Sequence, residues 1–519
     1  MAFYPALVRS SFNFHDQIDG FEAMTKQPSR SGDAMQDLPA VEDQPASQTL
    51  NSRTMTDTEY LNKLGYKQEL NRALGLFSSF GVQFTSISVG SVVLTTMIVG
   101  FAFFGPAAFW SFLIGGALQV FLVGLAVGEL VSAFPLSGGV YQIINRLTGK
   151  TWLAWQGGWW LVIAHTVAVT AVAVAVVPFV AGWLGFSNLS TGQTTIWALA
   201  IMVVVTVVNI AGVKIAAIFN NMGVFAEIGG ILLVIAGLVF AHYQRAPMTT
   251  LMDTAGTVHG GLWIGPFLFS MLVPAFTISS FDATGNAAEE TKDAARTAPM
   301  GTFLANTAAY VTGVIFILLL VLAIPNVSVM MASSTPVDYI LRTSVGPVVT
   351  TIFETCAMVA LFANMCMVQL TGVRVMWSKA RDGQMPGAHW LRKVNKHRIP
   401  INATLVCGVL SGLFALWSSL LSVLAAMTAL AWALAYGVVV ACALKAVLQK
   451  KLPEHPWSLG RFSFPVFLGA TLWSIILCTL LAWSNPISVG LGMVITIIIG
   501  FGIYFTIPKS RRGKTVVID

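Results

Sequence analysis

Long apolar runs constrain this chain more than any other feature of its sequence. We count twelve, each about 20 residues long, the length that a helix needs to cross a hydrocarbon core roughly 30 Å thick. Because every backbone N–H and C=O must be paired inside lipid, such runs cross it as helices. The sequence therefore predicts an all-α integral membrane protein with twelve transmembrane helices, at about 74–103, 107–132, 153–183, 194–213, 221–242, 262–284, 302–324, 348–372, 401–421, 423–445, 464–483 and 487–507.

Composition and charge agree with a membrane protein. Hydrophobic residues make up 56% of the chain and charged residues 10%, which argues against a soluble globular protein. With a cytoplasmic N-terminus, Arg245 and Arg342 are the only Lys or Arg residues of the sequence in outer loops. This asymmetry explains the formal net charge of +7 without nucleic acid. We expect a multi-pass protein of the plasma membrane with both termini in the cytoplasm and membrane lipid as a partner.

Five parts follow from the pattern of apolar and polar residues. We expect a disordered cytoplasmic tail over 1–56, an interfacial segment over 57–72 and a ten-helix transport core over 73–446. The last two helices, with the inner loop before them, occupy 447–507, and a cytoplasmic tail follows over 508–519. The polar start of the chain predicts no cleavable signal peptide.

Two of the apolar runs are interrupted by small polar residues. The first interruption reads Phe-Thr-Ser-Ile-Ser-Val-Gly-Ser over 84–91, and the second reads Phe-Thr-Ile-Ser-Ser-Phe-Asp over 276–282. A helix in lipid unwinds only where the freed backbone groups face a ligand, an ion or other protein. Paired interruptions in two halves of a chain point to the binding site of a secondary transporter. The alternative is that these residues only let helices pack closely.

Ionisable residues inside the apolar runs are candidates for function, because a charge within the membrane is costly. Asp282 directly follows the second interruption, where it can attract an amine, anchor a helix end or carry a proton. Glu227 lies among apolar residues of the fifth run and is a candidate for proton exchange. His165 in the third run can shuttle a proton, although a lone histidine is more often a satisfied core residue.

The sequence argues against an enzyme or an ATP-driven pump. It has no HExxH or GxSxG motif and no GxxxxGK[ST] phosphate loop. Its five cysteines lie inside apolar runs without CxxC spacing, so neither a metal nor a disulfide is expected. We predict no cofactor.

Three loop motifs resemble those of the amino acid–polyamine–organocation transporters. They are Phe-Pro-Leu-Ser-Gly-Gly-Val-Tyr over 134–141, the Glu-Glu-Thr-Lys-Asp stretch of 289–299, and Ala-Arg-Asp-Gly-Gln-Met-Pro over 380–386. The lead-in over 64–70 is similar to the branch that holds amino acid, GABA and choline permeases. The resemblance implies a five-plus-five inverted repeat with helices 1 and 6 broken at mid-membrane, followed by helices 11 and 12.

The resemblance also implies roles for residues at the two breaks. A solute carboxylate would bind at the first break, and an amine at the second, where Asp282 tunes the charge. Glu227 would carry the proton or stand in for a coupling cation. Independently of the resemblance, Phe276 and Phe281 flank the second break and are candidates for a gate, the alternative being ordinary packing. Arginine-exchanging members have Gly-Ser-Gly in the first break, where this chain has Val-Gly-Ser. The substrate-binding residues implied are Ser88, Val89, Gly90, Ser91, Phe276, Thr277, Ile278, Ser279, Ser280 and Asp282.

The inner-loop motifs carry opposite charges. We expect Glu290, Arg296, Arg381 and Asp382 to pair when the inner side is shut, the alternative being solvated loop charge.

These observations together predict a secondary active transporter. It would import a small amine-bearing solute, such as an amino acid, GABA or a related organocation, by proton symport with alternating access. The alternatives are sodium-coupled transport or exchange of the same solutes, a channel, and a nutrient sensor that does not transport. The sequence leaves the solute and the oligomeric state open.

Overall fold

The computed structural model describes residues 56–508 except 64, 69, 71, 73, 187–188, 242–244, 260, 397 and 418–420. All of them belong to one compact unit, Asn51–Asp519. The predicted N-terminal tail before Thr56, the signal-peptide prediction and the predicted C-terminal tail beyond Pro508 lie outside the described residues. Within the predicted interfacial segment, the helix α2 is short (Asp57–Lys63), and it buries Leu61.

Every regular element in the described part of the chain is a helix, apart from an isolated bridge between Leu74 and Thr291. The helices after α2 are α3 (Leu76–Ile87), α4 (Val89–Phe104), η2 (Gly105–Ala107), α5 (Ala108–Leu118), η3 (Gln119–Gly124), α6 (Leu125–Ala133), α7 (Gly139–Thr148), α8 (Thr151–Trp183), α9 (Thr191–Ala211), α10 (Val213–Phe240), η4 (Met248–Met252), α11 (Ile264–Ser270), α12 (Leu272–Thr277), α13 (Ala283–Asn286), η5 (Ala288–Glu290), α14 (Ala294–Leu322), α15 (Val327–Ala332), α16 (Pro336–Ser344), α17 (Pro347–Arg381), α18 (Ala388–Leu391), α19 (Ile401–Phe414), η6 (Ala415–Trp417), α20 (Leu421–Leu448), η7 (Gly460–Phe462), α21 (Ser463–Ser484), η8 (Pro486–Leu491) and α22 (Gly492–Thr506).

Nine helical segments among the described residues are long and apolar enough to cross a membrane. One of them, Leu76–Ala133, has 58 residues, far more than a single crossing needs. The chain turns inside it at Gly105, whose φ of +57° suits glycine. Two shorter apolar helical segments, Ile264–Thr277 and Ile401–Phe414, lie where two further spans are predicted. The chain is therefore an all-helical integral membrane protein, and the count of twelve spans stays a prediction.

The centre of the bundle is α8. The most apolar stretch of α8 is completely buried, and the helix packs against α7, α9, α17, α19 and α20. In contrast, α9, α10, α21 and α22 expose large apolar side chains such as Ile196, Phe240 and Ile498. An apolar side chain that faces outward on such helices suits contact with lipid.

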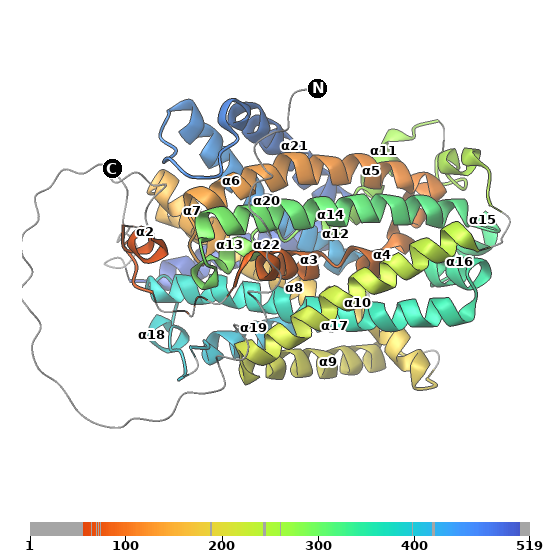
Figure 1. Cartoon of the computed structure of the whole chain (residues 1–519), viewed down its shortest axis with the longest axis horizontal. Helices are drawn as coiled ribbons and strands as arrows, with labels where there is room; N and C mark the ends of the chain where they lie inside the picture. Colours follow the sequence, from red (N-terminus) through yellow and green to blue (C-terminus); the bar gives the residue numbers. More distant parts are fainter. Residues whose placement is uncertain are drawn as a thin grey trace, which may run out of the picture. The chain divides into compact units, whose positions relative to one another are not determined.

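Helices α10 and α17 pack closely against each other, and α10 crosses in front of α17 in Figure 1. A Cβ at Gly223 of α10 would lie 2.3 Å from the Cβ of Ala363, and one at Gly230 would lie 2.9 Å from the Cβ of Cys356. Small residues of this kind let the backbones of two membrane helices approach each other. This contact positions Glu227, which lies on α10 between the two glycines.

Candidate functional site

The first predicted interruption is a break of one residue. Helix α3 ends at Ile87 and α4 begins at Val89, while Ser88 between them adopts the left-handed conformation (φ 49°, ψ 55°). The Ser88 N–H still donates to Phe84 O at 2.9 Å, and Val92 N–H donates to Ser88 O at 2.8 Å. The break therefore brings the C-terminal carbonyls of α3 and the N-terminal N–H groups of α4 to the same buried place.

The Glu227 carboxylate accepts hydrogen bonds from the N-terminus of α4. The N–H groups of Gly90 and Ser91 donate to Oε1 at 2.6 and 3.3 Å. The Ser88 hydroxyl donates to Oε2 at 2.9 Å, and the Ser91 hydroxyl donates to the same oxygen. Glu227 is 3% exposed, so this is a buried carboxylate with four donors at the positive end of a helix dipole. Such a set of donors suits the ionised form.

A second side chain forms hydrogen bonds with the other end of the break, the C-terminus of α3. Asn364 of α17 donates through Nδ2 to Thr85 O at 2.9 Å and to Ser86 O at 2.8 Å. The break is thus held by a carboxylate from α10 and an amide from α17. Our sequence interpretation missed Asn364. Its signal was an amide inside the apolar stretch of the eighth span, which is costly unless it is hydrogen-bonded.

The second interruption is longer. Helix α12 ends at Thr277 and α13 begins at Ala283. Between them Ser280 has a φ of +57°. The N–H of Ile278 donates to Pro274 O at 2.8 Å, and the Ser279 hydroxyl donates to Phe276 O at 2.7 Å. The local bonds therefore hold the end of α12, while the chain from Ile278 to Asp282 leaves the helix.

The buried carboxylate of Asp282 lies at the start of α13. Asn286 donates to it through Nδ2, and the Tyr436 hydroxyl of α20 donates to its other oxygen. His165 Nε2 of α8 lies 3.8 Å from Asp282 Oδ2. Asp282 therefore joins the second break to α8 and α20, and the contact with His165 was not predicted from the sequence.

Several buried polar atoms around the second break have no hydrogen-bond partner in the described part of the chain. They include the hydroxyls of Thr277 and Ser280 and the indole N–H of Trp432. A cavity of about 10 Å³, room for about one water, is lined by Trp432 and by Ser279 and Phe281 of the second break. Unpaired buried polar groups are rare in folded proteins, so this place is a candidate site for binding a polar group. The cavity is lined by Gln119, Val123, Ala275, Ser279, Phe281, Ala429, Trp432, Ala433, Tyr436, Ser474 and Leu477.

The two candidate gate residues pack against aromatic side chains of α20. The ring of Phe276 lies 6.4 Å from that of Trp432, and the ring of Phe281 meets Tyr436 edge to face at 5.5 Å. Phe281 also borders the small cavity. Their role as a gate remains a prediction.

The predicted site residues form two clusters. Glu227 gathers Ser88, Gly90 and Ser91, whereas Asp282 belongs to the second break. Other predicted residues are buried in packing. Val89 lies against α14 at Gly313, and Ile278 is fully buried. Thr277, Ser279 and Ser280 lie at the second break, where Ser279 borders the small cavity together with residues of α20.

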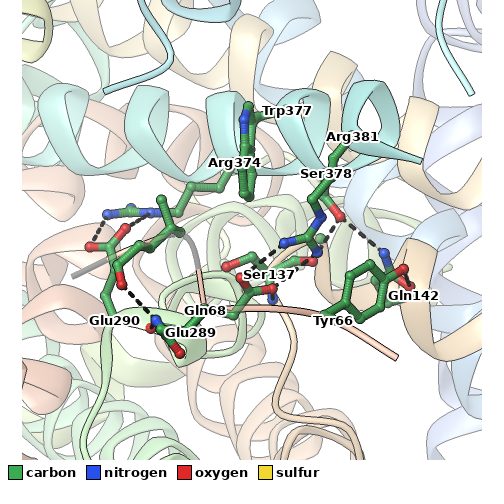
Figure 2. A network of polar contacts seen from close by, with 12 residues as sticks. Tyr66, Gln68, Ser137, Gln142, Glu289, Glu290, Arg374, Trp377, Ser378 and Arg381 are labelled. Carbon is green, nitrogen blue, oxygen red and sulfur yellow. Dashed lines mark hydrogen bonds and ion pairs between the residues drawn. The ribbon is translucent and has the colours of Figure 1, made fainter. Parts of the chain in front are cut away.

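At the end of the bundle that the sequence predicts to face the cytoplasm, two buried ion pairs tie α17 to the segment after the second break, as Figure 2 shows. Arg381 donates to both oxygens of Glu289 at 3.0 and 3.1 Å, and Arg374 donates to both oxygens of Glu290 at 2.9 and 2.8 Å. Two parallel bonds of this kind fix the geometry as well as the charge. They hold the predicted inner-loop motifs together.

Asp382 is the acceptor of a second part of this network. Its carboxylate accepts from the hydroxyls of Tyr66 (3.1 Å) and Tyr141 (3.0 Å) and from Gln142 Nε2 (2.9 Å). Burial raises the pKa of Asp382 above its ordinary value, although Arg381 and the three donors act in the opposite direction. Burial, followed by the neighbouring Asp382, raises the pKa of Tyr66 to about 12.

The segment before α3 is fixed to the loop that follows the second break. Leu74 N–H donates to Glu290 O at 2.9 Å, and Lys292 N–H donates to Leu74 O at 2.8 Å. Arg72 adds a bond to Thr291 O at 2.7 Å. The segment that leads into the first broken helix and the segment that follows the second are therefore connected through backbone hydrogen bonds.

The predicted inner charges pair in part as expected. Arg381 and Glu290 are both in buried pairs, but Arg296 lies 3.7 Å from Asp293 at an exposed position. The partner of Glu290 is Arg374, which our sequence interpretation missed. Its signal was an arginine near the inner end of the eighth span, where a charge needs a partner.

A helical bundle with this many apolar segments and two broken helices is a multi-pass membrane protein. The profile of the amino acid permease family matches residues 74–504, most of the chain, so the chain belongs to this family. It is a transporter of a small molecule rather than an enzyme.

Known relatives align with this chain over most of their length. The chain is 28% identical over 471 residues to the amino-acid permease BAT1 homolog of Oryza sativa subsp. japonica, covering 82% of this chain and 87% of that protein. It is 26% identical over 476 residues to the amino-acid permease BAT1 of Arabidopsis thaliana, covering 82% and 88%. The thiamine transporter thi9 of Schizosaccharomyces pombe is 24% identical over 516 residues, covering 88% and 86%.

Proposed function

We propose that this chain is a secondary active transporter that imports a small amine-bearing solute with a proton by alternating access. The solute class comprises amino acids, GABA and related organocations. Relatives described as amino-acid permeases support this class, and so does a relative described as a thiamine transporter, because thiamine is an organic cation. The protein would lie in the plasma membrane with both termini in the cytoplasm.

The proposed layout is a five-plus-five inverted repeat of ten spans followed by two more. The observation that carries the proposal is the pair of helix breaks, one in the first span and one in the sixth. Each break turns backbone and hydroxyl groups into the buried interior. In transporters, broken helices of this kind bind solutes and coupling ions at mid-membrane.

The described conformation suits a state that is closed on the inner side. Buried pairs formed by Arg374 and Arg381 hold the inner loops together, and the cavity beside the second break has room for about one water. Alternating access requires these pairs to separate and the space between the breaks to widen.

We propose that the solute amine binds at the second break, near the unpaired hydroxyls of Thr277 and Ser280. Asp282 would tune the charge of that side. At the first break, the N–H groups of Gly90 and Ser91 already donate to Glu227. A solute carboxylate would therefore bind there only after Glu227 has moved away.

This arrangement supports a coupling role for Glu227. Four donors favour its ionised form while α4 lies against α10. When the two helices separate, the buried carboxylate loses these donors and takes up a proton instead. Proton uptake would thus accompany the movement that frees the first break.

Asn364 supports proton rather than sodium coupling. Carbonyl groups at the C-terminus of a half-helix are ligands for Na⁺ in transporters. In this chain the carbonyls of Thr85 and Ser86 accept from the Asn364 amide instead. Sodium coupling and exchange remain the alternatives to be tested.

The test is uptake of labelled solutes into proteoliposomes. We expect an inward proton gradient to drive uptake of an amine-bearing solute and a sodium gradient to have no effect. Counterflow of labelled solute without any gradient distinguishes a carrier from a channel or a sensor. Binding without counterflow would overturn the proposal in favour of a sensor, and sodium-driven uptake would overturn the proton coupling.

A further inference from the structure

The orientation of His165 fixes where its ring carries hydrogen. Nδ1 lies 2.7 Å from the backbone oxygen of Leu161. A carbonyl oxygen only accepts, so Nδ1 must carry the proton. The other nitrogen, Nε2, faces Asp282 Oδ2 at 3.8 Å and has no hydrogen-bond partner in the described part of the chain.

Without a further proton this contact is repulsive. A neutral ring with hydrogen on Nδ1 turns the lone pair of Nε2 toward the Asp282 carboxylate. Both side chains are 1% exposed, so water does not screen them. One added proton, on Nε2 or on Oδ2, converts the repulsion into attraction and leaves the pair neutral overall. Without that proton, Asp282 is a buried carboxylate stabilised by the neutral donors Asn286 and Tyr436, which is costly for a charged group away from water.

The surroundings hold the pair in place. A Cβ at Gly372 of α17 would lie 2.8 Å from the Cβ of His165, so the two helices are in close contact there. From α20, Trp432 meets the ring edge to face at 5.7 Å. Tyr436, also on α20, donates to the other oxygen of Asp282. Among the described residues, Asp282 and Tyr436 are the ionisable groups recorded in contact at this place.

We propose that His165 and Asp282 form a proton-binding site that holds one proton between them and links α8 to the second break. The inference deepens the proposed function, on which it rests for the coupling of the proton to transport. It assigns a second proton site besides Glu227. Release of this proton leaves a net negative charge at the break and removes the attraction that holds α8 against it. The site therefore favours the closed arrangement only when it is protonated.

The charge state is tested directly in protein with ¹⁵N-labelled histidine and ¹³C-labelled aspartate in lipid nanodiscs. Only seven histidines contribute, and His165→Gln identifies the signal of His165. Near pH 7 we expect one proton on either Nε2 or the Asp282 carboxyl group. Where the proton is on Nε2, Asp282→Asn should return the His165 ring to the neutral form. A bare Nε2 beside an ionised Asp282 in the wild-type protein would overturn the proposal, and this arm needs no variant to fold.

The matched control is His455, whose ring is oriented in the same way. Its Nδ1 lies 2.7 Å from Pro453 O, and its Nε2 lies 3.2 Å from Glu129 Oε1. His455→Gln should leave the signals of His165 and Asp282 unchanged.

Transport separates this inference from the proposed function. His165→Gln should retain counterflow while the pH dependence of gradient-driven uptake weakens by several-fold, and His455→Gln should keep the wild-type profile. An unchanged pH profile in His165→Gln would refute the coupling of this site. If the spectra show the shared proton but no solute is transported, the proton site stands and the proposed function fails.

Discussion

Glu227 shows how one residue is made compatible with the membrane interior. Its carboxylate is buried and accepts hydrogen bonds from Ser88, Gly90 and Ser91 of the first break. The same contacts that satisfy the charge also hold α4 against α10. The residue is therefore structural in the described conformation, and under the proposed mechanism it becomes available for coupling when the helices separate.

Substituting Glu227→Gln tests both parts of this role. The glutamine oxygen can still accept from the N–H groups of Gly90 and Ser91, but its NH2 group replaces the oxygen that accepts from the Ser88 and Ser91 hydroxyls. Those hydroxyls must then accept instead of donate, and the charge-assisted bonds are lost, so we expect a loss of about 1–3 kcal/mol in stability. We also expect slower uptake with a flattened pH profile. Thermal unfolding and proteoliposome uptake measure these effects. Glu454→Gln, at an exposed position, is the control and should leave both stability and uptake unchanged. Wild-type uptake with an unchanged pH profile in Glu227→Gln would exclude the coupling role.

At the scale of the elements, the break in the first span depends on two neighbouring helices. Glu227 from α10 holds the N-terminus of α4, and Asn364 from α17 holds the C-terminus of α3. The contact between α10 and α17 therefore sets the geometry of the break. A substitution in the contact between α10 and α17 should therefore alter the geometry of the break, even when the substituted residue does not contact the break.

Gly223→Ala tests this dependence. The added Cβ would lie 2.3 Å from that of Ala363, so α10 must move away from α17. Overpacking of this kind typically costs about 1–3 kcal/mol. We expect a lower melting temperature and reduced uptake. Gly229→Ala on the same helix meets nothing within 4 Å and should be neutral or slightly stabilising. Equal effects of the two substitutions would contradict the packing argument.

Asn364→Asp tests whether the amide replaces a cation. A carboxylate at this position would face the carbonyl oxygens of Thr85 and Ser86 and repel them. We expect the variant to be destabilised and then to recover on addition of sodium, because carboxylate and carbonyl oxygens together suit a hard cation. Melting curves in sodium and in choline chloride measure the difference. The melting temperature of the wild-type protein should not depend on sodium. If sodium does not raise the melting temperature of the variant, the amide of Asn364 does not replace a cation.

At the scale of the whole transport unit, the inner network and the two breaks are one connected system. Arg374 and Arg381 of α17 pair with Glu290 and Glu289 just after the second break. Asn364, on the same helix, binds the first break. A displacement of α17 would therefore affect both breaks and the inner closure together.

The pair of Arg374 and Glu290 should favour the inner-closed state. Arg374→Met leaves the buried Glu290 without its partner, and we expect a loss of about 3–5 kcal/mol. The double variant with Glu290→Gln should recover much of this loss. Arg296→Met, in the exposed pair with Asp293, should cost about 1 kcal/mol or less. Thermal unfolding and hydrogen exchange in residues 289–299 measure the effect. A double variant as unstable as Arg374→Met would exclude the pairing as the cause.

The sequence predicted the features that have a local signal. Small polar residues in apolar runs located both breaks, and the charged loop motifs located the inner network. The partners across the bundle were missed, as with Asn364, Arg374 and the contact between His165 and Asp282. Helices such as α8 and α17 are buried on most sides, so their sequence periodicity does not reveal which side faces which neighbour. Those pairings depend on how the helices pack.

The bridge between Leu74 and Thr291 has a mechanical consequence. A load applied to the chain just ahead of α3 would reach the far side of the second break through main-chain bonds, without passing through α14 or α17. A bulky fusion joined next to Arg72 would therefore strain both broken helices at once. An affinity tag for purification is better attached well upstream of α2, where it leaves this linkage undisturbed.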